Sequence, residues 1–249
     1  MIDIHNHYLA AVDDGPEVPE ESLLLARLAV EQGISHVLCT PHYHHGRYDW
    51  QAEKVAAAFA LLQQQVAEAG LPLTLAYAAE VRISDEILPD IRQGKVPFCG
   101  QWQGRDALLL EMPHAQIPVG IEALLKWLLK EGIQPIIAHP ERNKAIMRDV
   151  RRAQELTRGG ALLQLTAGSV AGHFGPAAQQ AAEHLLAQRC VQFIASDAHN
   201  PKRPPAMREG AAAVEAFARK QFGDAAAAAK LAEQLSKSNP EQLTASLFR

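Results

Sequence analysis

Two short clusters of potential metal ligands lie near the two ends of the chain. His5-Asn6-His7 comes at the start and Asp197-Ala198-His199 near the end, each directly after an apolar run typical of a β-strand. Imidazole nitrogens mixed with carboxylate oxygens suit Mn²⁺, Fe²⁺ or Zn²⁺ better than a sulfur-seeking ion. The two clusters therefore indicate chemistry that depends on divalent cations.

Single histidines and acidic residues follow four further apolar runs in the same way, and an aspartate lies in the loop after the first cluster. One His or Glu at a strand end is more often a hydrogen-bonded polar residue or a helix cap than a ligand. Here, however, six of the seven expected strands end in this way. Carboxylates gathered in one pocket repel each other unless cations offset their charge. The candidate ligands, enough for two to three ions, are His5, His7, Asp14, His42, Glu80, Glu111, His139, Asp197 and His199.

These side chains need a scaffold that brings distant strand ends together. Apolar runs predict strands at Ile2–His5, His36–Thr40, Leu73–Glu80, Ala107–Glu111, Gln134–His139, Ala161–Thr166 and Val191–Ser196. Helical patterns follow most of them, at Glu20–Gln32, Gln51–Ala69, Ile121–Glu131, Lys144–Arg158 and Pro176–Gln188. Such alternation implies parallel strands with right-handed crossovers, and parallel barrels gather their strand ends at one rim. We therefore predict an α/β barrel, one domain over residues 1–249, with a helical C-terminal segment at about 205–249.

Composition narrows the class of protein. The chain has 249 residues, 48% of them hydrophobic, which suits one large α/β domain. Its net charge of −4 argues against nucleic acid as a main partner. Three widely spaced cysteines indicate a reducing compartment, and no apolar stretch is long enough for direct membrane insertion. Because cleavage of a signal peptide would remove His5 and His7, we expect a cytoplasmic protein.

Several motifs occur in an order that resembles a known superfamily. A His-x-His pair, Thr40-Pro41-His42, a strand-ending Glu, His139-Pro140-Glu141-Arg142 and Ser196-Asp197-Ala198-His199 follow one another. This order resembles the PHP (polymerase and histidinol phosphatase) superfamily. The opening Met1–His7, followed by Asp13-Asp14-Gly15, more closely resembles the CpsB/CapC family of tyrosine-protein phosphatases from bacterial capsule and exopolysaccharide loci. The resemblance covers residues 1 to about 205.

The resemblance implies a single-domain distorted (β/α)7 TIM-like barrel, the PHP fold, which holds up to three divalent ions, usually manganese. By position, a first ion would be held by His5, His7, Glu80 and Asp197. Glu80 would bridge to a second ion, which would also be held by Glu111 and His139. A third ion would be held by Asp14, His42 and His199.

The implied activity is hydrolysis of a phosphate monoester by metal-activated water. Arg142 and Arg203 are the candidate phosphate-binding residues, because a planar guanidinium binds two oxygens at once, and Arg47 is a weaker third. The family implies a phosphotyrosine protein as substrate, in particular an autophosphorylating bacterial tyrosine kinase. A small-molecule phosphatase of the histidinol-phosphate type and a PHP-type exonuclease would share the metal chemistry. A non-enzymatic metal-binding regulator is a further alternative, but it would have no need of the two arginines.

Two features compete with these interpretations. Cys99 and Arg105 have the Cys-x5-Arg spacing of cysteine-dependent phosphatases, whose loop leads into a helix N-terminus. Arg105 instead precedes an expected strand, so we interpret the spacing as chance. His44 and His45 closely follow His42 and are expected not to be ligands, although a one-step shift among these three histidines stays open.

Overall fold

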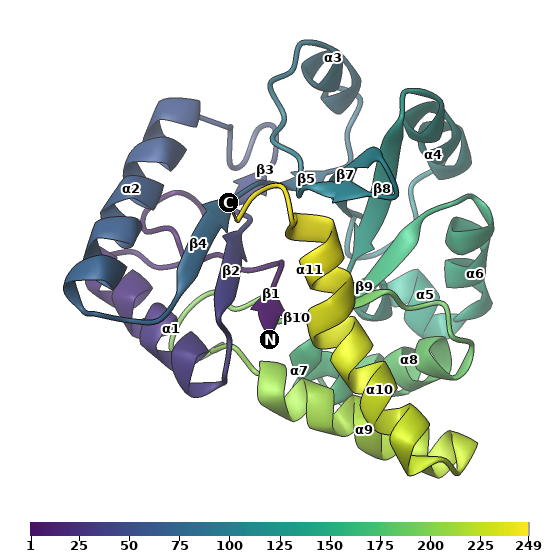
Figure 1. The fold of residues 1–249 in the computed structure, drawn as a ribbon. Helices are drawn as coiled ribbons and strands as arrows, with labels where there is room; N and C mark the ends of the chain where they lie inside the picture. Colours follow the sequence, from purple (N-terminus) through teal and green to yellow (C-terminus); the bar gives the residue numbers. More distant parts are fainter. Residues whose placement is uncertain (249) are drawn as a thin grey trace.

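In a computed structural model, which describes residues 1–248, parallel strands form a ring surrounded by helices (Figure 1). Strands β1, β2 and β4 form one parallel sheet, and β10, β9, β8, β7, β5 and β3 form the other, in that order. The bounds are β1 (Ile2–Asp3), β2 (His36–Cys39), β3 (His42–Tyr43), β4 (Thr74–Tyr77), β5 (Glu80–Arg82), β6 (Gln101–Trp102), β7 (Arg105–Glu111), β8 (Ile133–Ala138), β9 (Leu162–Thr166) and β10 (Phe193–Ala195).

Two positions in the ring are each built from an interrupted strand. β2 and β3 are separated by Thr40-Pro41, and β4 and β5 by Ala78-Ala79. Pro41 has no N–H to donate to a strand ladder, which accounts for the first interruption. The ring closes between β1 and β10, where Asp197 N donates to His5 O and His7 N donates to Ala198 O, both at 2.8 Å. With each interrupted strand counted once, and without the short β6, which pairs antiparallel with β7, the seven predicted strands of a distorted barrel are confirmed.

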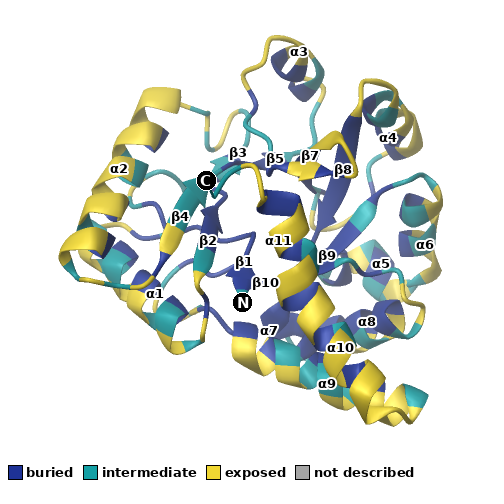
Figure 2. Ribbon diagram, in the orientation of Figure 1, coloured by how far each residue is buried: buried dark blue, intermediate teal, exposed yellow. Residues whose placement is uncertain are grey.

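Helices cover the outside of the ring, with their buried residues facing the strands (Figure 2). The bounds in the first part of the chain are α1 (Pro19–Glu31), α2 (Ala52–Glu68), α3 (Ile87–Arg92), α4 (Ile121–Lys130), the 3₁₀ helix η1 (Pro140–Arg142) and α5 (Lys144–Arg148). The remaining helices are α6 (Arg151–Arg158), α7 (Ala167–Val170), α8 (Pro176–Ala187), α9 (Met207–Phe222), α10 (Ala225–Glu233), the π-helix η2 (Gln234–Ser238) and α11 (Asn239–Thr244). None of the helices in residues 1–248 has both the length and the apolar character needed to span a membrane.

The prediction of one continuous helix after β8 is wrong. The predicted helix Lys144–Arg158 consists of α5 and α6, which meet at Asp149. Asp149 has an extended backbone (φ −147°, ψ 96°), and its Oδ1 accepts a hydrogen bond from Arg151 N at 3.2 Å. The extended backbone at Asp149 therefore ends α5, and α6 begins after Val150.

The C-terminal helices close the amino end of the barrel. η2 and α11 cross this end, next to β1, β6 and β10 (Figure 1). Leu243 is fully buried there, in one apolar cluster with Ile4, Trp102 and Phe193. The Phe248 ring packs against His36 at the start of β2, with 5.0 Å between ring centroids, and the Met1 amino group donates to Gly33 O at 2.9 Å. Both ends of the described chain therefore lie at the amino end of the barrel.

Candidate metal centre

All nine candidate ligands lie at the carboxyl end of the barrel. They form four overlapping groups, within each of which one potential ligand atom per residue lies within 4.8 Å of the others. The groups are His7, Asp14, His42 and His199; His5, His7 and Glu80; His5, His139 and Asp197; and His42, Glu80 and Glu111. These groups differ from the ligand sets that the resemblance implies, in which Glu111 and His139 hold the same ion. In the structure, His139 groups with His5 and Asp197, while Glu111 groups with His42 and Glu80.

Glu80, the first residue of β5, lies at the centre of these groups. Its Oε2 is 3.3 Å from the Nε2 atoms of both His5 and His7 and 3.0 Å from His42 Nδ1. Its Oε1 is 2.8 Å from His139 Nε2. A single carboxylate thus faces four imidazoles from three other strands and their loops.

Several buried polar atoms in the cluster have no hydrogen-bond partner. These atoms are His5 Nε2, His7 Nε2, His42 Nδ1 and Glu80 Oε2. Buried polar atoms in folded proteins are normally satisfied, so four such atoms facing a common space indicate groups arranged for a ligand. Nitrogen and carboxylate oxygen donors in this number fit divalent ions of the Mn²⁺, Fe²⁺ or Zn²⁺ type.

Hydrogen bonds from outside the nine residues orient the first two histidines. His5 Nδ1 lies 2.7 Å from Gln164 Oε1 on β9, and His7 Nδ1 lies 2.7 Å from Asp13 Oδ2. Both contacts leave the Nε2 atom of each histidine facing the cluster. Metal-bound histidines typically have their other ring nitrogen hydrogen-bonded in this way. Gly15 permits the Asp13 turn, because a Cβ at that position would lie 2.3 Å from His7 O.

The strand ends after β8 and β10 carry an unusual backbone. His139 (φ 34°) and Asp197 (φ 51°) both lie in the left-handed region, which residues other than glycine rarely adopt. Such conformations cost free energy and concentrate at functional sites. Here they occur at two candidate ligands, directly where each strand turns into its loop.

The electrostatics of the site favour ionised carboxylates. Burial raises the pKa of Glu80, but the His5 and His42 imidazoles outweigh burial and hold it well below its ordinary value. Burial also opposes ionisation of Asp197, yet Arg203 and Arg142 keep the pKa of that carboxyl well below its usual range. The two anions are therefore charged at neutral pH and able to bind cations.

The histidines differ from one another. Burial alone would lower the pKa of His42, but the Glu80 carboxylate raises it to about 10. For His199, burial and then His7 lower the pKa to about 3. At neutral pH His199 is ready to act as a neutral ligand, whereas His42 would have to release a proton on binding a metal.

The two predicted phosphate-binding arginines lie beside the same cluster. Arg142 ends η1 and Arg203 follows β10, and both guanidinium groups donate to Asp197 Oδ2. They line a cavity of about 120 Å³ with most of the candidate ligands. Arg82 lies on the same cavity and pairs with Glu111 at 3.0 Å, a contact that the sequence analysis did not anticipate.

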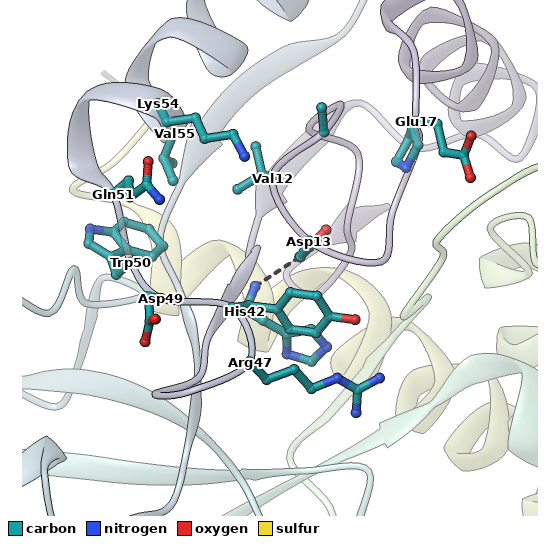
Figure 3. A pocket seen from close by; sticks show the side chains of 13 residues that line it. Val12, Asp13, Glu17, His42, Arg47, Asp49, Trp50, Gln51, Lys54 and Val55 are labelled. Atoms are coloured by element: carbon teal, nitrogen blue, oxygen red, sulfur yellow. Dashed lines mark hydrogen bonds between the residues drawn. The ribbon is translucent and has the colours of Figure 1, made fainter.

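A second, larger pocket of about 410 Å³ lies next to this cavity (Figure 3). His42, Arg47 and Tyr48 line both hollows. The Tyr48 ring stacks on His42 at 5.3 Å and 5°, and the Arg47 guanidinium lies 5.1 Å from the Tyr48 ring centroid. The stacked pair thus forms a wall between the metal cluster and the pocket.

The residues of the two competing interpretations belong to none of the four groups of candidate ligands. His44 lines the small cavity but is in none of the groups, and His45 Nε2 lies 2.8 Å from Asp90 Oδ2. Cys99 is buried inside the barrel, where burial raises the pKa of its thiol to about 12. Arg105 begins β7, so a strand and not a helix follows the Cys-x5-Arg segment.

Comparison with known proteins identifies related sequences across most of the chain. Residues 1–244 match the family described as "Capsular polysaccharide synthesis, CpsB/CapC". The putative tyrosine-protein phosphatase CapC of Staphylococcus aureus is 37% identical over 207 residues, which cover 83% of this chain and 80% of that protein. The tyrosine-protein phosphatase CpsB of Streptococcus pneumoniae is 31% identical over 252 residues, covering 98% of each.

Solved structures agree with these relatives. A crystal structure reported for YwqE of Bacillus subtilis and CpsB of Streptococcus pneumoniae, described as unique metal-dependent tyrosine phosphatases, superposes with a TM-score of 0.85 at 32% identity. The match covers 99% of this chain and 95% of that one. A lactonase from Listeria monocytogenes, at a TM-score of 0.59 and 13% identity, shares the fold alone. The chain belongs to the CpsB/CapC family.

Proposed function

We propose that this chain is a metal-dependent protein-tyrosine phosphatase that hydrolyses phosphotyrosine in a protein substrate. One observation carries the proposal: nine candidate ligands and two arginines converge at one end of the barrel, around a cavity of about 120 Å³. The relatives named as tyrosine-protein phosphatases and the metal-dependent structural match support the same reaction.

The nine residues are proposed to hold two to three divalent ions, with Mn²⁺ the first choice and Fe²⁺ or Zn²⁺ the alternatives. When bound, such ions lower the pKa of a coordinated water and neutralise phosphate oxygens. The protein contributes the placement of the ligands. The Glu80 carboxylate contacts the imidazoles of His5, His7, His42 and His139. Hydrogen bonds with Gln164 and Asp13 set the orientation of the His5 and His7 rings.

Arg142 and Arg203 are proposed to bind the phosphoryl oxygens. Each guanidinium offers paired N–H donors in one plane, which match two oxygens of a phosphoryl group. Their positive charge also offsets the charge that develops on those oxygens in the transition state. Because both side chains are mostly buried, at 19% and 27% exposed, water screens that charge only weakly.

The proposed substrate is a phosphotyrosine segment of a protein, in particular of an autophosphorylating bacterial tyrosine kinase in capsule or exopolysaccharide regulation. The small cavity is suited to a phosphoryl group, and the neighbouring pocket beyond Tyr48 gives room for flanking polypeptide (Figure 3). The proposed location is the cytoplasm, where the three free cysteines would stay reduced.

Phosphate release from three substrates tests the proposal. Purified protein would be assayed with a phosphotyrosine peptide, histidinol phosphate and single-stranded DNA, each after chelation and after adding back Mn²⁺. We expect Mn²⁺-dependent turnover of the peptide, with His184→Ala, at an exposed histidine on α8, as a control variant that keeps the nine candidate ligands. Preferential turnover of histidinol phosphate or DNA would assign the small-molecule phosphatase or the exonuclease, and metal binding without turnover would favour a regulator.

A further inference from the structure

The guanidinium groups of Arg142 and Arg203 lie against the same aromatic ring. The central carbon of Arg142 is 4.6 Å from the centroid of the Phe174 ring, and that of Arg203 is 5.2 Å away. Both distances are within the range of cation–π attraction. One half-buried phenyl ring therefore contacts both candidate phosphate-binding residues.

Sheet order explains why this ring lies between them. β9 is the neighbour of both β8 and β10. Arg142 is in the segment after β8, Arg203 is in the segment after β10, and Phe174 is in the loop after β9, between α7 and α8. None of the nine candidate ligands lies in the segment between β9 and β10. The loop after β9 instead contributes Phe174, which contacts the two arginines.

The loop that carries Phe174 is held in place by short-range contacts. His173 N donates to Gly168 O at 2.8 Å, and Gly175 N donates to Gly172 O at 3.2 Å. Gly168 also lets the ring approach the start of α7, since a Cβ there would lie 3.1 Å from Phe174 Cε2. Backbone hydrogen bonds and close packing on α7 therefore support the ring in this position.

Phe174 differs in kind from the other partners of the two guanidinium groups. Within residues 1–248, their hydrogen bonds and ion pairs go to Asp197 and His199, which are both candidate metal ligands. Arg203 Nε is buried without any hydrogen-bond partner. The aromatic ring is a partner whose interaction does not depend on the state of the metal groups.

We propose that Phe174 is a positioning residue that holds Arg142 and Arg203 together in the orientation that binds the phosphoryl group. This proposal rests on the proposed function, in which these two arginines contact phosphate. The ring does not line the small cavity, so it acts through the arginines and not on the substrate. The ring is uncharged, so it adds no countercharge to the one that the Asp197 carboxylate already supplies to both guanidinium groups.

The first test replaces the ring while leaving the arginines. We expect Phe174→Leu to lower kcat/KM for a phosphotyrosine peptide about tenfold, the scale of two cation–π contacts in a partly desolvated site. The inhibition constant of inorganic phosphate should rise, while metal content stays at the wild-type level. Phe174→Tyr, which keeps the ring, should remain within about threefold of wild type. Phe59→Leu, at a half-buried phenylalanine on α2, is the matched control.

The second test asks whether Phe174 acts through the arginines. In an Arg142→Ala/Arg203→Ala background, Phe174→Leu should change phosphate binding to the Mn²⁺-loaded protein by less than about twofold, because coupled residues lose their separate effects. An equal tenfold loss in that background would overturn the proposal, as would wild-type kcat/KM in Phe174→Leu. If Phe174→Leu failed to fold, Phe174→Met would take its place under the same criteria.

Binding of inorganic phosphate to the Mn²⁺-loaded protein, measured by titration calorimetry, separates this inference from the proposed function. Absence of phosphotyrosine hydrolysis in the wild-type protein would reject the function. A Phe174-dependent affinity for inorganic phosphate in the same protein would still support the positioning role, and phosphate affinity that ignores Phe174 would reject it.

Discussion

The two ends of the barrel are built on opposite principles. At the carboxyl end, buried polar atoms such as His5 Nε2 and Glu80 Oε2 lack hydrogen bonds, and His139 and Asp197 have left-handed backbones. At the amino end, Leu243 of α11 packs into an apolar cluster with Trp102 and Phe193. Unsatisfied polar groups and strained backbone cost free energy, whereas apolar burial supplies it.

The residues that stabilise the fold and the residues of the candidate site are therefore separated along the barrel axis. The strands connect the two ends, so a rim that is unfavourable by itself is held in place by packing elsewhere. Variants at the rim should therefore change activity with little loss of stability, and variants at the amino end should do the reverse.

The largest effect is expected from loss of a candidate metal ligand. His139→Ala removes an imidazole that contacts Glu80 at 2.8 Å, and activity should fall by more than the 10- to 100-fold typical of residues that only orient ligands. His44→Ala should cost far less, because His44 is in none of the four groups of candidate ligands. Steady-state kinetics with elemental analysis would check both, and equal damage from the two variants would contradict the ligand assignment.

The next effect concerns Arg142, a candidate phosphate-binding residue. Arg142→Ala should lower kcat/KM about a hundredfold, or roughly 3 kcal/mol, because the transition state loses one charged donor. Metal content should not change, since a cation is not a metal ligand. Arg142→Lys should recover only part of the loss, because an ammonium group does not present two coplanar donors. Normal kinetics in Arg142→Ala would exclude a role in phosphate binding.

At the amino end the expected effect is on stability. Leu243→Ala leaves a void in the apolar cluster and should lower the free energy of unfolding by about 2–5 kcal/mol, measured by denaturant titration. The kcat of the folded fraction should match wild type, because Leu243 lies at the end of the barrel remote from the metal groups. A large fall in kcat without a change in stability would show that the two ends are not separate.

The smallest effect is expected inside the barrel between the two ends. Cys99→Ala should change kcat less than about threefold, because the buried thiol has its pKa raised to about 12 and is not a nucleophile at neutral pH. Rate measurements with and without a thiol-alkylating reagent would check this. A loss of more than about a hundredfold, typical of a deleted catalytic group, would restore the cysteine mechanism.

The sequence predicts the rim better than it predicts the support around it. Strand-ending residues such as Glu80 and His139 are readable because parallel strands gather their ends. Gln164 and Asp13 were not predicted as partners, since their contacts with His5 and His7 depend on a hydrogen-bond geometry that spacing does not give. The sequence does not predict a role for Phe174, because a single aromatic residue in a loop belongs to no periodic pattern or motif.

Local backbone chemistry explains the remaining differences. The sequence predicts one strand through Thr40, but Pro41 interrupts the ladder and β3 starts again at His42. It predicts one helix where the extended backbone of Asp149 separates two. Periodicity averages over many residues, so it does not detect a change made by one side chain.

The position of the chain ends has a practical consequence. Met1 bonds to Gly33, and Phe248 packs on His36, both at the amino end of the barrel. A linker joined near Phe248 would fix the amino end of the barrel to a bead or sensor. The carboxyl end of the barrel, with the candidate metal ligands, would then face the solution. An immobilised preparation should still capture bulky phosphoproteins, so surface-based binding assays and substrate pull-downs can use this end for attachment.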